Sequence, residues 1–194
     1  MKFVTEKVKI VESLQNAAAV AERRQTIPIL ANLRLKIIDG RLEVTATDLE
    51  IQIKTFSDLL EIKEEGETTV SARKMSELCR SLPDNENVEF SLDNGKLSVS
   101  SRNFNADFAT ISSDDFPEIE INEEQIPISI DSAKFKRVLS KTSFSMASQD
   151  VRYYLNGMLL EIGAGKINGV ATDGHRLAFS SVEAASTELE TRNI

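Results

Sequence analysis

The sequence predicts an α+β protein made of repeated units, each with one strand, one helix and three further strands in antiparallel sheets. Three observations lead to this class. Amphipathic segments of helical spacing alternate with apolar runs too short for helices. The turns between those runs are short and rich in Asp, Asn and Gly, as antiparallel hairpins require. The same order of elements recurs along the 194 residues, which indicates an internal repeat.

The first copy occupies about the first sixty residues. Apolar residues at helical spacing over roughly residues 7–22 predict an amphipathic helix. The two-residue turn Asp39-Gly40 lies between two alternating runs, which is a strong hairpin signal. The predicted strands of this copy cover residues 2–5, 33–38, 42–47 and 49–56.

The second copy repeats this order. Ser71 is a predicted N-cap, and the helix over residues 72–82 is expected to end before Pro83, which cannot continue it. Its apolar stripe includes Cys79, the single cysteine of the chain. One cysteine forms neither an intrachain disulfide nor a thiolate metal site alone, so we interpret it as a small buried residue. The predicted strands cover residues 68–70, 88–92, 97–101 and 104–111.

A third copy follows an acidic segment, residues 112–125, which contains Pro117, shows no clear periodicity and is interpreted as a linker. The helix of this copy, capped by Asp131 or Ser132, is expected to bury three residues, Phe135, Val138 and Leu139. Its strands are predicted at residues 126–130, 158–162 and 167–171, with Gly163 to Gly165 as the hairpin turn and a last strand from His175.

The copies also match residue by residue. Gly40-Arg-Leu-Glu-Val-Thr-Ala-Thr-Asp48 aligns with Gly165-Lys-Ile-Asn-Gly-Val-Ala-Thr-Asp173, and both end a hairpin strand with Ala-Thr-Asp. Gly174 then supplies the positive φ of a tight turn in which Asp173 can bond the backbone two residues on.

Two copies per domain make residues 1–120 one complete domain and residues 121–194 the first half of a second. The tail from Glu183 is polar, and no strand is predicted in it. Half a domain would leave an open sheet and an unburied helix face. We therefore expect the natural protein to be longer than this chain.

Composition and charge indicate the class of partner. With 41% apolar and 28% charged residues the chain resembles ordinary soluble globular proteins. It has no run of about 20 apolar residues and no signal peptide, which predicts a cytoplasmic protein without a membrane partner. The net charge is −8, yet the helical segments, counted as residues 5–24, 72–82 and 132–148, hold 11 of 23 basic and only 4 of 31 acidic residues. Basic helices suit a phosphate-bearing partner.

Motifs for catalysis or cofactor binding are absent from the sequence. His175 is the single histidine, and no G-x-S-x-G, H-E-x-x-H, P-loop or G-x-G-x-x-G motif occurs. Asp173 beside His175 could be imagined as an orienting carboxylate, but an aspartate in a turn usually bonds the backbone. The sequence predicts a protein that is not an enzyme and has no metal site and no cofactor.

Both tyrosines of the chain stand next to an arginine, as Arg152, Tyr153 and Tyr154, and Gln149 lies close by. These side chains suit contacts to phosphates or base edges. The alternative is that the tyrosines are core or strand residues, and the sequence leaves both interpretations open.

Two long motifs resemble one family. Gln149-Asp-Val-Arg-Tyr-Tyr-Leu-Asn-Gly-Met158 and Val170-Ala-Thr-Asp-Gly-His-Arg-Leu-Ala178 closely resemble the bacterial DNA polymerase III β subunits, the replicative sliding clamps. Thr26-Ile-Pro-Ile-Leu30 and Thr47-Asp-Leu-Glu50 match that family too. The resemblance covers all but the last dozen residues. It implies the DNA-clamp fold, in which three similar domains per subunit form a head-to-tail dimeric ring around duplex DNA, with sheets outside and helices lining the channel.

This chain is expected to lack the third domain. The ring of the family closes between the first domain of one subunit and the third domain of the other, so we expect a homodimer only from the full-length protein.

By position, the resemblance assigns residues to three surfaces. The DNA contacts are Arg24, Arg73, Gln149, Tyr153 and Tyr154. The pocket for short partner motifs contains Arg152, Leu155, Thr172, Gly174, His175, Arg176 and Leu177. The ring interface contains Lys74, Leu78, Phe104 and Phe108. We further expect Leu155, Thr172 and Leu177 to lie on three neighbouring strands, with Gly174 in the turn between two of them.

The predicted function is that of a processivity factor, which encircles duplex DNA and tethers a polymerase to it. The resemblance implies as partners the catalytic subunit of DNA polymerase III, the clamp loader, and other polymerases and repair proteins with clamp-binding motifs. The alternative is an interaction scaffold that binds peptides without encircling DNA. Salt-dependent DNA binding through the helix faces would distinguish the two.

Overall fold

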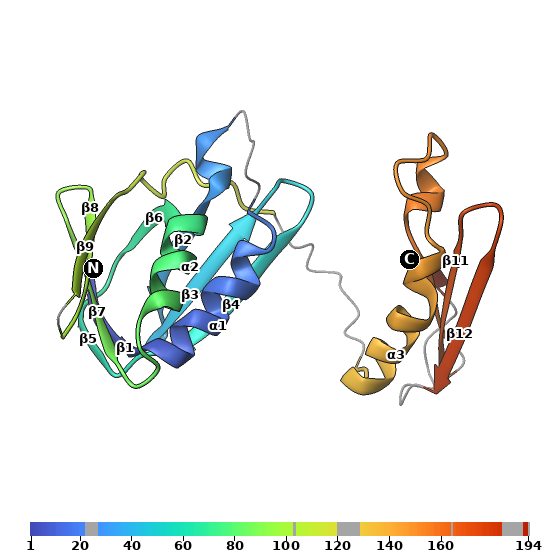
Figure 1. Ribbon diagram of the computed structural model, residues 1–194, viewed down its shortest axis with the longest axis horizontal. Helices are drawn as coiled ribbons and strands as arrows, with labels where there is room; N and C mark the ends of the chain where they lie inside the picture. Colours follow the sequence, from blue (N-terminus) through green and yellow to red (C-terminus); the bar gives the residue numbers. More distant parts are fainter. Residues whose placement is uncertain (22–26, 103, 120–128, 164, 184–191, 194) are drawn as a thin grey trace. The chain divides into compact units, whose positions relative to one another are not determined.

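The computed structural model describes residues 1–21, 27–102, 104–119, 129–163, 165–183 and 192–193. The chain forms two compact units, Met1–Ile121 and Asn122–Ile194, each with antiparallel strands and helices of its own (Figure 1). The predicted α+β class is confirmed. No helix within the described ranges is both long and apolar enough to cross a membrane.

Two antiparallel sheets form the first unit. The first sheet has the order β5-β1-β7-β8-β9, and its strands are β1 (Lys2–Glu6), β5 (Glu61–Glu64), β7 (Asn87–Asp93), β8 (Lys96–Ser101) and β9 (Phe104–Ala109). The second sheet has the order β4-β3-β2-β6, and its strands are β2 (Asn32–Ile38), β3 (Arg41–Thr47), β4 (Gln52–Asp58) and β6 (Glu67–Ser71).

The two repeat copies exchange their first strands. β1 of the first copy pairs with β7 of the second, with Phe3 opposite Phe90, while β6 of the second copy pairs with β2, with Val70 opposite Leu33. The rings of Phe3 and Phe90 are fully buried and stack with their centroids 4.7 Å apart. Neither copy completes a sheet alone, so the two copies share one hydrophobic core.

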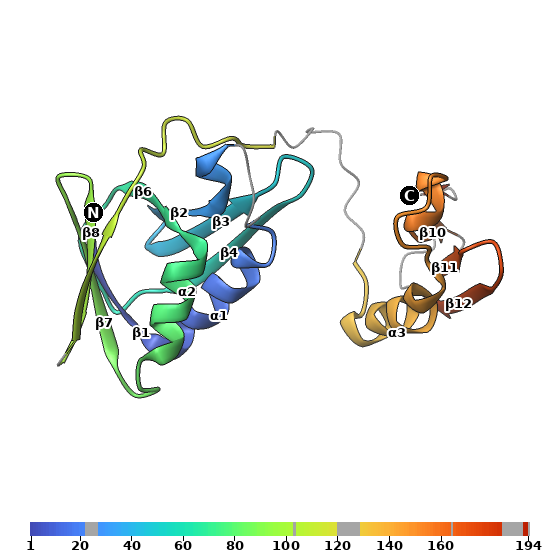
Figure 2. The same ribbon diagram turned by 45° about the horizontal axis from the view of Figure 1, so that its top comes forward.

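Two helices lie side by side in both views, α1 (Lys7–Ala18) and α2 (Ala72–Ser81) (Figures 1 and 2). Ser71 caps α2 as predicted, because its Oγ accepts a hydrogen bond from the backbone N–H of Lys74. Cys79 is fully buried, and this burial raises the pKa of its thiol to about 12. α1 is shorter than predicted, because the N–H of Val20 bonds back to Ala17 and tightens the last turn.

Two strands of the first unit differ from the prediction for local reasons. β4 begins at Gln52, because one carboxylate oxygen of Asp48 accepts hydrogen bonds from the N–H groups of Glu50 (3.0 Å) and Ile51 (2.7 Å) and keeps them in a turn. β5 was not predicted, because its four residues are all exposed and show no apolar alternation.

The segment after β9, residues 111–119, is here called the strap, and it lies against the second sheet. Ile111 forms a bridge with Thr69 of β6, which shortens β9 relative to the prediction. Phe116 is buried with two residues of the 3-10 helix Pro28–Ala31, and the guanidinium of Arg34 lies 5.4 Å from its ring centroid. The first part of the predicted linker is thus fixed on the first unit, and residues 120–125 lie outside the described residues.

The second unit packs one helix on one sheet. The sheet has the order β12-β11-β10-β13, and α3 lies across β11 and β12. Its elements are α3 (Ser132–Thr142), the 3-10 helices η2 (Ser143–Ser145) and η3 (Tyr153–Asn156), and the strands β10 (Leu159–Gly163), β11 (Lys166–Thr172), β12 (Leu177–Glu183) and β13 (Arg192–Asn193). The helix cap is Asp131, whose carboxylate accepts a hydrogen bond of 2.9 Å from the N–H of Lys134.

Three expectations for the helix and strands of this unit are wrong. Leu139 is 36% exposed, because the stripe of α3 that meets the sheet runs through Val138 and Thr142, and Leu139 lies beside it. The tail does contain a short strand, β13, which pairs with β10. A strand of two residues shows no periodicity in the sequence. It forms because the edge of β10 offers backbone groups for pairing. Of the strand predicted at 126–130, residues 126–128 lie outside the described residues and the last two are not in a strand.

Candidate DNA-binding and peptide-binding surfaces

The turn between β11 and β12 is built by its own side chains. One carboxylate oxygen of Asp173 accepts hydrogen bonds from the N–H groups of His175 (2.9 Å) and Arg176 (3.0 Å). These bonds lower the pKa of Asp173 to about 2. Gly174 has φ +89° and donates its N–H to the hydroxyl of Thr172 at 3.1 Å. The predicted turn is confirmed, and β12 begins at Leu177 rather than His175 because the turn holds the two residues before it.

The same turn occurs in the first unit after β3. There Asp48 accepts the two N–H bonds, and the hydroxyl of Thr47 accepts one from Leu49 at 3.0 Å. Leu49 takes the place of Gly174 and has φ +79°, a conformation that costs a leucine free energy. The repeat seen in the sequence is therefore a repeat of turn geometry as well as of strands.

A second rigid loop precedes η3. Arg152 donates to the carboxylate of Asp150 three times, through its backbone N–H (2.8 Å), its Nε (3.0 Å) and its Nη2 (2.9 Å). The side-chain bonds from Arg152 are the main reason why the pKa of Asp150 falls to about 2. Asn156 closes the loop by exchanging two hydrogen bonds with the backbone of Asp150. The guanidinium of Arg152 is thereby held in one place.

The loop and the turn meet at Gly174. A Cβ atom on Gly174 would lie 3.3 Å from both Nη atoms of Arg152, so the guanidinium lies directly against this glycine. In the same turn, the guanidinium of Arg176 lies 5.8 Å from the ring centroid of Phe144 in η2. Arg152 and Gly174 are thus brought together from two separate segments, and Arg176 lies two residues after Gly174 in the same turn. Phe144, 58% exposed, extends this surface and was not predicted, because no spacing in the sequence links it to Arg176.

The apolar members of this surface come from fewer strands than expected. Thr172 and Leu177 are direct neighbours in the register of β11 and β12. Leu155 lies in the 3-10 helix η3 rather than in a strand, and its carbonyl accepts a hydrogen bond of 2.9 Å from Ala147. The expectation of three neighbouring strands is wrong, because the motif around Asp150 folds on its own hydrogen bonds instead of joining a sheet. Leu177 is 66% exposed.

Tyr153 and Tyr154 are on the surface. They are 82% and 71% exposed, and their rings meet edge to face with centroids 6.4 Å apart. The interpretation as core or strand residues is wrong, since both lie in the exposed helix η3. Gln149, also exposed, has φ +57° at the start of the same loop. Two exposed rings beside a fixed guanidinium can contact a phosphate backbone or a base.

Comparison with known proteins identifies the family. Residues 1–120 match the family described as DNA polymerase III beta subunit, N-terminal domain, and residues 129–194 match the central domain of the same subunit. The chain belongs to the DNA polymerase III beta subunit family. The predicted resemblance is confirmed.

The relatives are beta sliding clamps. The chain is 41% identical over 184 residues to the beta sliding clamp of Pseudomonas aeruginosa and 40% identical over 182 residues to that of Escherichia coli K12, which covers 95% and 94% of this chain. A crystal structure of the beta subunit from Pseudomonas aeruginosa superimposes on the whole chain with a TM-score of 0.94 and 38% identity, over 53% of that protein. The clamp fold is therefore confirmed. The chain spans about half the length of the curated relatives it matches.

The DNA contacts that the beta subunit family implies in the first unit are Arg24 and Arg73. Arg24 lies outside the described residues. Arg73 is exposed on α2 and donates from Nε to the carboxylate of Glu77 at 2.8 Å, which raises the pKa of Arg73. Its guanidinium is therefore partly neutralised before any ligand binds.

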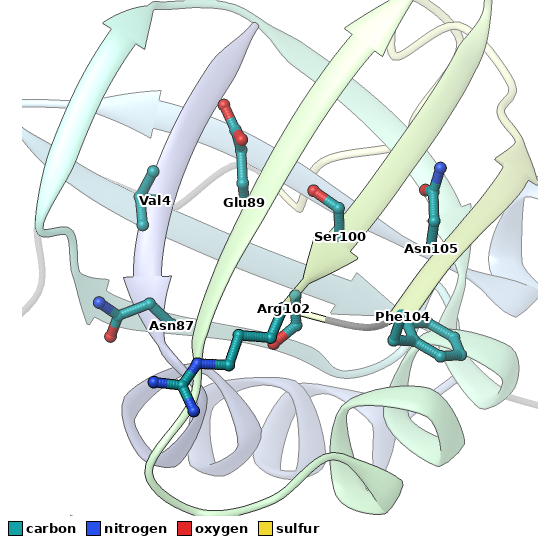
Figure 3. A pocket seen from close by; sticks show the side chains of 8 residues that line it. Val4, Asn87, Glu89, Ser100, Arg102, Phe104 and Asn105 are labelled. Atoms are coloured by element: carbon teal, nitrogen blue, oxygen red, sulfur yellow. The ribbon is translucent and has the colours of Figure 1, made fainter.

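The residues matched to the ring interface of beta subunits lie on α2 and β9. β9 is an edge strand of the first sheet. Phe108 and Leu78 pack against the core, whereas Lys74 and Phe104 are exposed. Phe104 borders a hollow of about 550 Å³ on this sheet, where it lies at the same end of the strands as Asn87 and Arg102 (Figure 3).

Metal binding finds no support in the described part of the chain. No group of three or more His, Cys, Asp or Glu side chains there is placed to hold an ion.

Proposed function

We propose that this protein is a non-enzymatic processivity factor of DNA replication. In this function it lies around duplex DNA in the cytoplasm, as part of a homodimeric ring of the full-length protein. It tethers the polymerase III catalytic subunit and other partners with clamp-binding motifs, and it receives the clamp loader. Family membership over both units supports this proposal.

One structural observation carries the DNA-binding part of the proposal. α3 bears four basic residues and no acidic residue, and all four are exposed: Lys134, Lys136, Arg137 and Lys141. None of them forms an ion pair with any described residue. Cations without an ion-pair partner are free to neutralise phosphates, and this releases the counterions condensed on the DNA and favours binding. The described residues thus place four cations without an ion pair on one helix of a chain whose net charge is −8.

The first test removes part of this charge. In the double substitution Lys136→Gln and Arg137→Gln, we expect weaker binding to duplex DNA and a salt dependence shallower by about two units, since each phosphate contact contributes about 0.9. Fluorescence anisotropy of a labelled duplex, measured across a salt series with the 194-residue chain, gives both quantities.

The matched control is Lys63→Gln with Lys96→Gln. These lysines lie on the first sheet, paired with Glu89 at 3.1 Å and Asp107 at 2.7 Å, and their removal changes the net charge equally. We expect the control to leave the salt dependence unchanged. If both double variants bind alike, DNA binding does not use α3 and the scaffold alternative gains support.

The second test concerns partner peptides at the Arg152–Gly174 contact. Gly174→Ala places a methyl group 3.3 Å from the guanidinium of Arg152 and strains a backbone with φ +89°, so Arg152 must move. We expect a labelled peptide with a polymerase clamp-binding motif to bind several-fold more weakly, while duplex binding stays unchanged.

Gly95→Ala is the control for backbone strain alone. Gly95 has φ +73°, and a Cβ there would meet nothing within 4 Å. We expect this variant to bind the peptide normally. Equal peptide affinity of Gly174→Ala and the parent chain would place the partner site elsewhere.

A further inference from the structure

A groove of about 460 Å³ lies between α1 and α2 in the first unit. Alanines from both helices, among them Ala18 and Ala72, line part of it. The polar lining comes from six residues, Gln15, Ser71, Arg73, Ser76, Glu77 and Arg80. Small apolar side chains let a ligand approach the helices closely, and the polar groups can hold it.

Ser76 has a hydroxyl without a partner. The residue is only 8% exposed, and its Oγ is buried with no hydrogen bond in the structure. Three other hydroxyls on α2 and α3 bond back to the preceding turn: Ser81 to Leu78 (2.7 Å), Ser140 to Arg137 (3.1 Å) and Thr142 to Val138 (2.7 Å). A buried hydroxyl left unpaired costs free energy, which a ligand in the groove would recover.

The position of Ser76 on α2 directs it to the groove. It stands four residues after Ala72 and four before Arg80, and residues at this spacing share one helix face. All three line the groove. Ser76 and Arg80 therefore border the same space, and a change of the Ser76 rotamer brings its hydroxyl to the groove.

The charge of the groove favours an anion. Glu77 opposes one, but its carboxylate already accepts a hydrogen bond of 2.8 Å from Arg73. Arg80 is exposed and forms no ion pair with any described residue, so the lining carries a net positive charge.

We propose that the α1–α2 groove binds one phosphodiester of a DNA strand. The hydroxyl of Ser76 and the guanidinium of Arg80 bond the phosphate oxygens, and the deoxyribose packs on the alanine lining. This inference rests on the proposed DNA-binding function. It adds a specific hydrogen-bonded contact to a surface that is otherwise described only by its charge. Free phosphate offers the same oxygens, and the test separates the two sources.

The test uses Ser76→Ala and Arg80→Gln in the 194-residue chain. Ser76→Ala should weaken duplex binding about tenfold, as expected for one hydrogen bond to a charged group, while its thermal stability equals or exceeds that of the parent chain. Arg80→Gln should reduce the salt dependence by about one unit. The controls are Ser81→Ala, whose hydroxyl is paired, and Arg102→Gln, an exposed arginine in the turn after β8, and both should bind normally.

A second measurement on the parent chain does not depend on variants. Backbone amide NMR shifts of α2 are followed during titration with inorganic phosphate and with a short duplex. Shifts with both ligands assign a phosphate site, and shifts with the duplex alone assign a site for the sugar–phosphate strand.

Three results would overturn the inference. In the first, neither ligand shifts these amides. In the second, Ser76→Ala and Arg80→Gln bind like their controls while the α3 variant is weakened, which leaves the proposed function standing. In the third, the α3 variant also binds duplex DNA like the parent chain, which would contradict both the groove site and the proposed DNA-binding function.

Discussion

Replacing Arg34 by alanine is expected to destabilise the first unit by about 3–5 kcal/mol, because it leaves a buried carboxylate without its cation. Arg34 is 7% exposed on β2, and its Nη2 lies 3.2 Å from Oε1 of Glu43, which is 8% exposed. Arg34 also pairs with Glu118 of the strap and lies beneath the ring of Phe116. The substitution therefore removes the cation of Glu43 and one of the two cations beside Glu118, and it loosens the strap. Urea unfolding of the 194-residue chain measures the loss.

Arg41→Ala is the matched control on the neighbouring strand. Arg41 is exposed, its Nε lies 3.5 Å from Asp58, and its guanidinium lies 5.1 Å from the ring centroid of Phe56. Exposed ion pairs contribute little, so we expect a loss below about 1 kcal/mol. Changing Arg34 to Met together with Glu43 to Leu should recover most of the stability, since apolar residues replace the whole buried pair. Equal losses of unfolding free energy in Arg34→Ala and Arg41→Ala would contradict this expectation. They would show that water solvates the carboxylate of Glu43 once Arg34 is removed.

The second large effect is expected from Gly169→Ala, which should destabilise the second unit by about 1–3 kcal/mol through overpacking. A Cβ on Gly169 would lie 2.5 Å from Cγ1 of Val138 on α3, closer than any real contact. Met158 (3.2 Å) and Thr142 (3.4 Å) close the remaining space. Val138 is fully buried and β-branched, so it has no other rotamer to adopt within the helix. α3 must move away from β11, and hydrogen exchange of its amides should rise.

Gly157→Ala is the control, because a Cβ there meets nothing within 4 Å and φ is −119°. It should leave stability nearly unchanged. Adding Val138→Ala to Gly169→Ala should recover part of the loss, because it removes the clashing methyl group, and the double-mutant cycle measures that coupling. Additive effects of the two substitutions would mean that the helix and the strand are not in direct contact.

Much of the fold could be predicted from local patterns. The hairpin turns, the caps Ser71 and Asp131, and the Thr-Asp turns that repeat in both units all depend on atoms two to four residues apart. Where local signals were weak, the prediction failed. β5 has no apolar alternation, and Leu155 lies in a motif that forms a 3-10 helix from its own hydrogen bonds.

The surfaces were predicted in part. Tyr153, Tyr154 and Arg152 are exposed, which suits a binding role, but their exposure could not be derived from the sequence, where a core position was equally open. Phe144 and Ser76 were missed. Their features, a ring beneath the guanidinium of Arg176 and a hydroxyl without a partner, exist only once separate segments are packed.

Local sequence was enough to predict the order of elements, the repeat, the turn around Gly174 and the concentration of basic residues on the helices, because each depends on neighbouring residues or on composition. Packing between distant segments sets three other features: the exchange of β1 and β6 between the copies, the burial of Arg34 beside the strap, and the contact of Gly169 with Val138. From the sequence alone, Arg34 would be placed on the exposed face of its alternating strand, and Gly169 would be expected only to weaken the strand that contains it. What makes each essential is a segment distant in the chain, whose position depends on the packing of the whole unit.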